Sequence, residues 1–390
     1  MNQVVLGMAG AARGCELHMG GYQKVYGVDL RLKKVMDMKK EAADAAKTRY
    51  GFEEAVYDFE DLLKDPEINL IDICTPPYAH PDMIIKALAA GKNVICEKPL
   101  TGYFGREGDE EPIGDKVSKT HMFECMKEDI ARLEKAVKGS GKHFCYAENF
   151  VYAPAVQRAA EIIRAKKSRI LYLKGEESLK GSSSPVAGYW KKSGGGTLMR
   201  VGSHPLGAAL YLKSVEAKAR GEEIRPESVV ADMTRITPSL SAYEHRHIAA
   251  DPHDVEDLCT MCLTFTDGTK ATIIATDALL GGSLNYVDCY CNDAAIKCNL
   301  TLADLMQTYM VDEDGLENVS LSEMLPIKTG WNNPFVVDDV IRGYAAEIQD
   351  FCEAVAYDRE AQADFELAKN VTLAMYAAYA AAEEGKRTEF

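Results

Sequence analysis

A lysine set between an acid and a proline is the first residue whose type and position could do chemistry. The apolar run Val94–Cys96 ends in Glu97, Lys98 and Pro99. Such a run is typical of a buried strand, and ligands of open α/β sheets bind beyond the carboxyl ends of the strands. A lysine held there can be partly desolvated, which suits it to acid–base work. A surface lysine in an ordinary strand-to-loop turn fits this short segment equally well.

A second candidate follows a run of three glycines. Gly194–Gly196 precede Arg200 and His204, which are four positions apart and share a face if the segment is helical. Histidine is the usual acceptor of a hydroxyl proton near neutral pH. We therefore expect His204 to be an acid–base group, with Arg200 orienting it or holding an oxygen. The structural alternative is a histidine packed at the start of a helix.

A glycine-containing turn follows the first predicted strand, Gln3–Leu6. A dinucleotide-binding fold places Gly-x-Gly-x-x-Gly at this point, so that backbone amides and a helix N-terminus can approach the pyrophosphate. Here alanine stands at the first two glycine positions, Ala9 and Ala11. The predicted pyrophosphate loop consists of Gly10, Ala11, Ala12, Arg13 and Gly14.

An acid ends the second predicted strand, Leu30–Met36. Asp37 stands where a carboxylate would bind the adenosine ribose hydroxyls. A carboxylate there would repel a 2′-phosphate, which favours NAD over NADP. Lys39 and Lys40 weaken that preference.

Two prolines close the apolar strand Ile68–Cys74. Thr75 and Pro76 place backbone near the expected cofactor edge of the sheet. His80 is also a candidate for the cofactor site, although its position near a helix start suits a structural role.

Four further residues are candidates for binding substrate. Asn149 and Tyr152 lie at the expected domain junction, and Tyr189 and Trp190 belong to an aromatic–basic cluster of the kind that packs on sugar rings. The histidine-rich stretch 243–257 matches no standard set of ligand spacings, so we expect no metal.

Strands and helices, the elements that must position these residues, alternate along the chain up to about residue 148. Strands follow helices such as Lys40–Tyr50 and Pro81–Ala90, which predicts a doubly wound parallel sheet. Residues 101–121 break the rhythm as a long polar loop, of the kind that often lies over active sites. After residue 148 the apolar segments become extended. The predicted architecture is a dinucleotide-binding domain, 1–148, and an α/β domain with a large, mostly antiparallel open sheet, 149–390.

Composition narrows the class of protein. The chain has 390 residues, 47% of them hydrophobic, and a formal net charge of −15, so nucleic acid is not an expected partner. No apolar run is long enough to span a bilayer, and no secretory signal is evident. The 11 cysteines lie mostly in apolar segments and suit a reducing compartment, so we expect a cytoplasmic protein.

Taken together, these motifs identify the chain as similar to the glucose–fructose oxidoreductase/inositol dehydrogenase (Gfo/Idh/MocA) family. Beyond the strand–glycine turn and Asp37, the resemblance rests on segments spread over almost the whole chain: Asp61–Pro66, Asp72–Pro77, His80, Ala90–Val94, Glu97–Pro99, Glu148–Asn149, Gly194–Gly196, His204, Phe265–Gly268 and Tyr376–Gly385.

The resemblance implies bound NAD and hydride transfer at a sugar or cyclitol carbon. It implies that Lys98 is the catalytic lysine and His204 its acid–base partner, and that Glu97 and Lys98 both belong to the cofactor site. It also implies a homo-oligomer formed through the C-terminal sheet. The pattern is most similar to members that oxidise the 3-hydroxyl of a glycoside.

One departure from the family leaves alternatives open. The family usually has aspartate where this chain has Arg200, so the proton relay differs from the usual one. Besides a dehydrogenase, the sequence allows a redox-neutral enzyme that retains NAD and releases an aglycone. It also allows a non-catalytic sugar or NAD sensor of the same fold.

Overall fold

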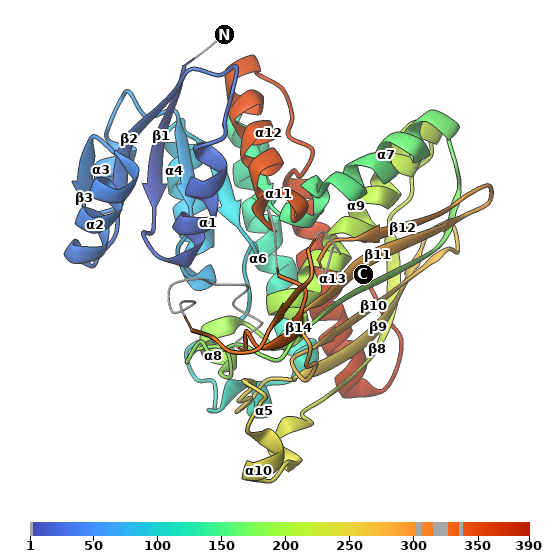
Figure 1. Cartoon of the computed structure of the whole chain (residues 1–390). Helices are drawn as coiled ribbons and strands as arrows, with labels where there is room; N and C mark the ends of the chain where they lie inside the picture. Colours follow the sequence, from blue (N-terminus) through green and yellow to red (C-terminus); the bar gives the residue numbers. More distant parts are fainter. Residues whose placement is uncertain (1–2, 302–305, 315–326, 335–337) are drawn as a thin grey trace. The chain divides into compact units, whose positions relative to one another are not determined.

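The chain folds into two compact units in a computed structural model, which describes residues 3–301, 306–314, 327–334 and 338–390 (Figure 1). The first unit comprises Met1–Tyr103, Glu124–Tyr152 and Gly343–Leu373, and the second comprises Phe104–Phe123, Ala153–Arg342 and Ala374–Phe390. The chain thus crosses between units more than once. The predicted single boundary between residues 148 and 149 stays a prediction.

A parallel sheet forms the centre of the first unit. Its strands are β1 (Val4–Ala9), β2 (Leu30–Met36), β3 (Glu54–Val56), β4 (Leu70–Ile73), β5 (Asn93–Glu97) and β6 (Phe144–Ala147). Their order is β3-β2-β1-β4-β5-β6, and every pairing is parallel. The order reverses between β1 and β4, which is where doubly wound sheets bind ligands. The predicted fold class is confirmed.

Helices connect these strands and complete the first unit. They are α1 (Arg13–Tyr22), α2 (Lys40–Tyr50), α3 (Glu60–Leu63), η1 (Pro77–Ala79), α4 (His80–Ala89), α6 (Lys119–Ser140), η2 (Asn149–Tyr152), α12 (Tyr344–Tyr357) and α13 (Phe365–Glu384). Both α6 and α13 also contribute residues to the second unit. Helix α12 packs on α1 (Figure 1). The contact is close, because a Cβ on Gly21 would lie 2.7 Å from Ile348.

A larger sheet forms the second unit. Its strands are β7 (Ile170–Ser178), β8 (Pro226–Thr234), β9 (Leu258–Phe265), β10 (Lys270–Thr276), β11 (Leu284–Cys291), β12 (Ala295–Asn299) and β15 (Thr388–Glu389). Their order is β12-β11-β7-β10-β9-β8-β15, with one parallel pairing, β7 with β10. The prediction of a mostly antiparallel sheet is therefore confirmed. Two further strands, β13 (Thr308–Met310) and β14 (Gly330–Asn332), pair with each other.

Helices cover one face of this sheet, where α7 and α9 pack (Figure 1). The helical elements of the second unit are α5 (Ile113–Lys116), α7 (Pro154–Lys166), α8 (Trp190–Ser193), the π-helical turn η3 (Leu198–Gly202), α9 (Ser203–Arg220), η4 (Thr237–Ser239), α10 (Ala242–His245) and α11 (Asp338–Ile341). The segment predicted as a long loop, 101–121, contains α5 and the start of α6. It is tied to the second unit by Gly114, whose N–H donates to Asp254 at 2.9 Å.

Candidate active site

The turn between β1 and α1 has the backbone of a phosphate-binding loop. Gly10 has a φ of +99°, which L side chains rarely adopt. A Cβ there would lie 2.7 Å from the carbonyl oxygen of Cys74. No described side chain caps the N-terminus of α1 after Ala12, so backbone N–H groups of its first turn are available to an anion. Arg13 is exposed and pairs with Glu16 at 2.8 Å.

Asp37 connects this turn to the end of β2. Its Oδ2 accepts a hydrogen bond from the N–H of Ala11 at 3.0 Å, and its Oδ1 accepts from the N–H of Lys39 at 2.9 Å. The carboxylate is half-buried at the carboxyl end of the strand. Asp37 therefore lies beside the predicted pyrophosphate loop, and its contact with the ribose stays a prediction.

The segment after β4 is held by a buried histidine. The Nε2 of His80 contacts the carbonyl oxygen of Thr75 at 2.8 Å, and its Nδ1 contacts that of Pro99 at 3.0 Å. Burial lowers the pKa of His80, which the two carbonyl contacts oppose. Because both ring nitrogens are occupied by backbone carbonyl groups of the same unit, these contacts favour a structural role for the side chain. Pro76 itself is exposed.

The end of β5 presents Glu97 and Lys98. Both are half-buried, and the peptide bond between Lys98 and Pro99 is cis. The Oε1 of Glu97 lies 3.4 Å from Nε2 of His18, an ion-pair distance rather than a hydrogen bond. Burial alone would raise the pKa of Glu97, but the interactions with His18, Lys98 and His80 together outweigh burial and lower that pKa. Lys98 thus follows an ionised carboxylate at the ligand-binding edge of the sheet.

Tyr152 is one of the two residues predicted at the domain junction. Its hydroxyl is hydrogen-bonded within the first unit. That hydroxyl donates to Asp350 at 2.8 Å and accepts from the N–H of Ala363 at 3.0 Å. These contacts favour a packing role over the predicted contact with substrate. Asn149 is buried in η2.

In the second unit, a buried acid organises the glycine-rich segment. Glu256 accepts hydrogen bonds from the N–H groups of Gly196 at 3.0 Å and Leu198 at 2.9 Å, and from the hydroxyl of Tyr379 at 2.8 Å. Burial raises the pKa of Glu256 to about 7, although the donors at Leu198 and Tyr379 oppose the shift. A Cβ on Gly196 would overlap the Glu256 carbonyl oxygen at 2.0 Å. The glycine is therefore required by this close approach.

The π-helical turn η3 carries Arg200, and π-helical turns are frequent at functional sites. The guanidinium donates to Asp277, which follows β10. Burial raises the pKa of Asp277, while Arg200 opposes the shift. His204 lies one turn later in α9 and is buried. The structure thus places a carboxylate beside Arg200, in a chain that lacks the usual aspartate at position 200.

A cavity of about 240 Å³ lies against this pair in the second unit. Its lining includes Tyr189, Arg200, His253, Glu256 and Asp277. The rings of Tyr189 and His253 are stacked, with centroids 4.2 Å apart.

Trp190 lines a different cavity, of about 220 Å³. Its ring is buried between Tyr379, at 4.7 Å, and the ammonium of Lys119, at 4.7 Å. Tyr189 is therefore in position to contact a ligand beside Arg200, whereas Trp190 is packed as part of the wall.

Sequence reasoning missed Asp277, Glu256 and a buried cluster around His18. Asp277 ends a strand in the same way as Asp37, but no sequence motif distinguishes it from other acids in strand ends. Glu256 lies in the histidine-rich stretch, which was considered from the sequence only as a possible metal site. In that stretch, the Nε2 of His245 contacts the carbonyl oxygen of Ala250 at 2.7 Å, a local structural contact.

The fold and these residues define an oxidoreductase with an NAD-binding Rossmann domain. The family model described as "Oxidoreductase family, NAD-binding Rossmann fold" matches residues 2–105, and the model of the Gfo/Idh/MocA C-terminal domain matches residues 157–297. The chain belongs to the Gfo/Idh/MocA family, as its sequence motifs indicated.

Characterised relatives include sugar and cyclitol dehydrogenases. Levoglucosan dehydrogenase of Pseudarthrobacter phenanthrenivorans is 27% identical over 335 residues, 81% of this chain and 78% of the relative. The scyllo-inositol 2-dehydrogenase (NAD(+)) of Bacillus subtilis is 31% identical over 184 residues, 47% of this chain and 46% of the relative.

Solved structures share the fold over the whole chain. GenD2 from gentamicin A biosynthesis, in complex with NAD, matches with a TM-score of 0.75 at 21% identity and covers 100% of this chain and 97% of its own. Levoglucosan dehydrogenase in complex with NADH and levoglucosan matches with a TM-score of 0.71 at 20% identity, covering 100% and 99%.

The residues of the first unit fit NAD. The glycine with positive φ at position 10, the uncapped start of α1 and the carboxylate of Asp37 correspond to the pyrophosphate and ribose contacts that this cofactor needs.

We found no helix among the described residues long and apolar enough to cross a bilayer.

Proposed function

We propose that this protein oxidises a secondary hydroxyl of a sugar or glycoside, at C3, with NAD as the hydride acceptor. The observation that carries the proposal is the position of Lys98, which follows β5 at the carboxyl edge of a sheet whose strand order reverses at β1. The names of the relatives support a cyclic polyol as substrate, since they act on levoglucosan and scyllo-inositol.

Gly10–Gly14 and Asp37 would hold the cofactor, which supplies an acceptor for a hydride. In the proposed reaction the sugar C–H bond breaks with its electron pair, and a ketone forms at the same carbon. His204 takes the hydroxyl proton, and Lys98 donates a hydrogen bond to the developing oxyanion. Positioned acid–base groups of this kind accelerate reactions by roughly 10²–10⁴-fold. The products are a keto sugar, reduced cofactor and a proton.

The cavity beside Arg200 supports a small polar substrate. Its volume of about 240 Å³ is below the roughly 300–1,000 Å³ typical of sites for drug-sized ligands. Arg200, Asp277 and Glu256 offer a cation and two acids, and the exposed ring of Tyr189 offers a flat apolar surface. Sugars combine hydroxyl edges with apolar ring faces, so this lining suits a single sugar ring.

Deuterium transfer tests the reaction and its position together. A hexose or glycoside deuterated at C3 should yield reduced cofactor carrying one deuterium, together with a 3-keto product. A reduced cofactor without deuterium would place oxidation at another carbon. Absence of any reduction with a broad panel would reject the dehydrogenase proposal.

The redox-neutral alternative makes a different prediction in the same assay. It requires release of free sugar and aglycone without net formation of NADH, whereas a dehydrogenase gives keto product and NADH in equal amounts. The sensor alternative rested on the loss of aspartate at position 200. The carboxylate that Asp277 places beside Arg200 weakens that argument.

We also propose that the chain forms a homo-oligomer through the sheet face opposite α7 and α9. That face carries Tyr172 and Tyr290, whose rings stack with centroids 6.0 Å apart, and the partly exposed Ile274. Light scattering with Ile274→Lys, which adds a charge to the face, should show a smaller particle than the wild-type protein.

The 11 cysteines, which are not in disulfides, suit the cytoplasm, where we expect the protein to work.

A further inference from the structure

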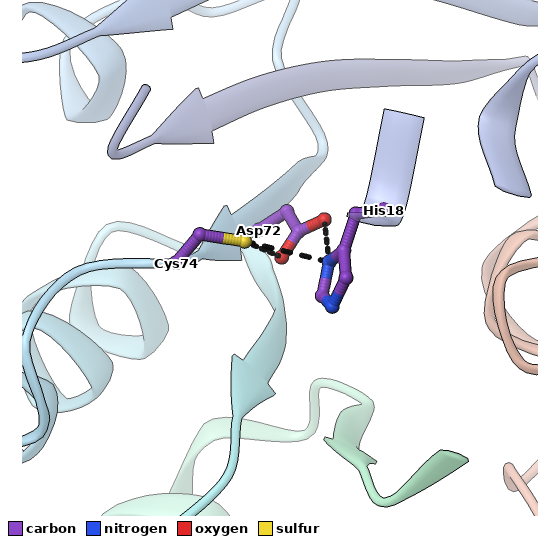
Figure 2. A group of neighbouring side chains, drawn as sticks. All are labelled: His18, Asp72 and Cys74. Carbon is purple, nitrogen blue, oxygen red and sulfur yellow. Dashed lines mark hydrogen bonds and ion pairs between the residues drawn. The ribbon is translucent and has the colours of Figure 1, made fainter. Parts of the chain in front are cut away.

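A cluster of titratable side chains from α1 and the end of β4 lies buried in the first unit. His18 of α1 contacts Asp72 of β4, with 2.8 Å between Nδ1 and Oδ2, and the Sγ of Cys74 at 3.4 Å (Figure 2). Tyr22 donates to the same Asp72 oxygen at 2.9 Å. Figure 2 shows Nε2 of His18 pointing away from these partners. That nitrogen lies 3.4 Å from Glu97.

The His18 ring therefore lies between two carboxylates from neighbouring strands, Asp72 of β4 and Glu97 of β5. The side chains of His18 and Asp72 are fully buried, and that of Glu97 is 13% exposed. Two buried carboxylates without a cation between them would be strongly unfavourable. Burial alone would lower the pKa of His18, but Asp72 and Cys74 together outweigh burial and raise that pKa well above its usual range.

A third acid faces the cluster from α12. Both carboxylate oxygens of Glu347 are buried, and they accept no hydrogen bond from a described atom. Burial raises the pKa of Glu347 well above its usual value, and the nearby acids Glu97 and Glu148 add to the shift while His18 opposes it. The shift favours the neutral form of Glu347. The positive charge of His18 is shared between Asp72 and Glu97.

Metal binding is the competing explanation for part of this cluster. The possible ligand atoms of His18, Asp72 and Cys74 lie within 4.8 Å of one another. However, the 2.8 Å between Nδ1 and Oδ2 is a hydrogen-bond distance. Burial and the neighbouring Asp72 also raise the pKa of the Cys74 thiol well above its usual value, whereas a metal ligand must be a thiolate. The contacts are those of a hydrogen-bonded network.

We propose that His18 is a positioning residue that acts as a doubly protonated bridge, anchored by Asp72, to hold Glu97 ionised and oriented next to Lys98. The geometry assigns a cation to His18 because its Nδ1 and Nε2 face acids from two adjacent strands. The inference rests on the proposed function and on the expectation that Glu97 belongs to its cofactor site.

The consequence concerns binding of NAD. An ionised Glu97 accepts hydrogen bonds from hydroxyl groups of a ligand at the sheet edge, whereas a protonated one accepts them less well. Without the charge of His18, only Lys98 and His80 would oppose the effect of burial, which raises the pKa of Glu97. Affinity for NAD would then depend on pH in a range where the wild-type affinity does not.

The first test measures His18 in the unmodified protein. The ¹⁵N shifts of the His18 ring, assigned by comparison with His18→Gln, should show both nitrogens protonated at pH 8. A neutral imidazole at pH 8 would overturn the proposal. One equivalent of zinc or another transition metal in the purified protein would also overturn it, because a metal-bound Nδ1 carries no proton.

The second test measures affinity for NAD by titration from pH 6 to pH 9. We expect His18→Gln to bind NAD at least tenfold more weakly than wild type at pH 6, and within threefold of wild type at pH 9. Glu97→Gln should bind weakly at every pH, and the double variant should match it. A loss in His18→Gln that is equal at all pH values, or no loss at all, would overturn the proposal.

A matched control is His143→Gln, which removes another histidine–aspartate pair of the same unit, with Asp358 at 2.9 Å. It should bind NAD as the wild type does. Because the titration needs no sugar, it is independent of the dehydrogenase proposal, whose failure would leave this result standing. If His18→Gln does not fold, the His18 ring is assigned in the wild-type protein by through-bond correlation with its own backbone, and the ¹⁵N measurement then decides the question.

Discussion

Arg200 in the π-helical turn η3 is paired with Asp277, which follows strand β10. This pair joins a helical segment to the sheet at the wall of the cavity in the second unit. The family usually has aspartate at the position of Arg200. Here a basic residue occupies that position and an acid from a strand end neutralises it. Compared with the usual family pattern, the charge at position 200 is reversed, but Asp277 keeps a carboxylate beside that position.

If Arg200 binds the sugar, Arg200→Met should raise KM far more than it changes the affinity for NAD. Loss of one charge-assisted hydrogen bond is worth about 1.5–3 kcal/mol, which corresponds to a rise of roughly 10–100-fold. Asp277→Asn should give a smaller rise, because the guanidinium remains. Arg220→Met, at the other end of α9, is the control and should leave KM unchanged. An unchanged KM in Arg200→Met would remove Arg200 from the substrate site.

Asp37 should set the preference between the two nicotinamide cofactors. Asp37→Asn keeps an oxygen for the N–H of Ala11, which lies 3.0 Å away, but removes the charge that would repel a 2′-phosphate. The ratio of NADP to NAD affinity should rise by about tenfold or more. Asp44→Asn, which changes an exposed acid of α2, is the control. Equal ratios in wild type and Asp37→Asn would show that another residue discriminates.

Alanine substitutions at Gly10 and Gly27 distinguish the cost of a positive φ from the cost of a steric clash. Both have positive φ, +99° and +70°. A Cβ on Gly10 would lie 2.7 Å from the Cys74 carbonyl oxygen, whereas one on Gly27 would meet nothing within 4 Å. Gly10→Ala should therefore lower Tm more than Gly27→Ala and should weaken NAD binding, which Gly27→Ala should not. Equal effects on both measurements would mean that the close approach does not matter.

Glu256 should make the stability of the protein depend on pH. Its pKa is raised from 4.5 to about 7 by burial, so its contribution is fully present below pH 4.5 and is lost as pH rises through 7. The free energy of unfolding of Glu256→Gln, relative to wild type, should rise between pH 5 and pH 8 by on the order of 3 kcal/mol.

Glu244→Gln provides the control for this measurement. Glu244 is exposed, and its hydrogen bonds with Ser241 lower its pKa. Its contribution is therefore present above the unfolded pKa of about 4.3, and the difference from wild type should be constant between pH 5 and pH 8. If the Glu256→Gln difference is also constant over this range, Glu256 does not titrate there.

The first unit could be predicted largely from sequence because its signals are local. Apolar runs such as Ile68–Cys74 mark strands buried on both faces, and Asp37 and Lys98 directly follow such strands. The three-residue edge strand β3 was missed because it buries little and therefore has little pattern.

The tertiary partners could not be predicted in the same way. Asp277 meets Arg200, and Glu347 faces His18, across long stretches of sequence. The return of α12 to the first unit depends on packing against Gly21, and a helix of the C-terminal tail carries no sign of which unit it will cover. His18 was not predicted, because the only motif recognised near it was the glycine-containing turn at residues 10–14.

Formation of NADH by wild type and Lys98→Ala, measured at 340 nm with NAD and a panel of sugars and glycosides, tests the central claim most directly. We predict that wild type reduces NAD with at least one member of the panel and releases a keto sugar in equal amount. Lys98→Ala should still bind NAD and retain less than about a tenth of the activity, given the rate contribution of roughly 10²–10⁴ from such a group. Greater retained activity in Lys98→Ala, or no reduction of NAD by the wild type with any member of the panel, would contradict this account.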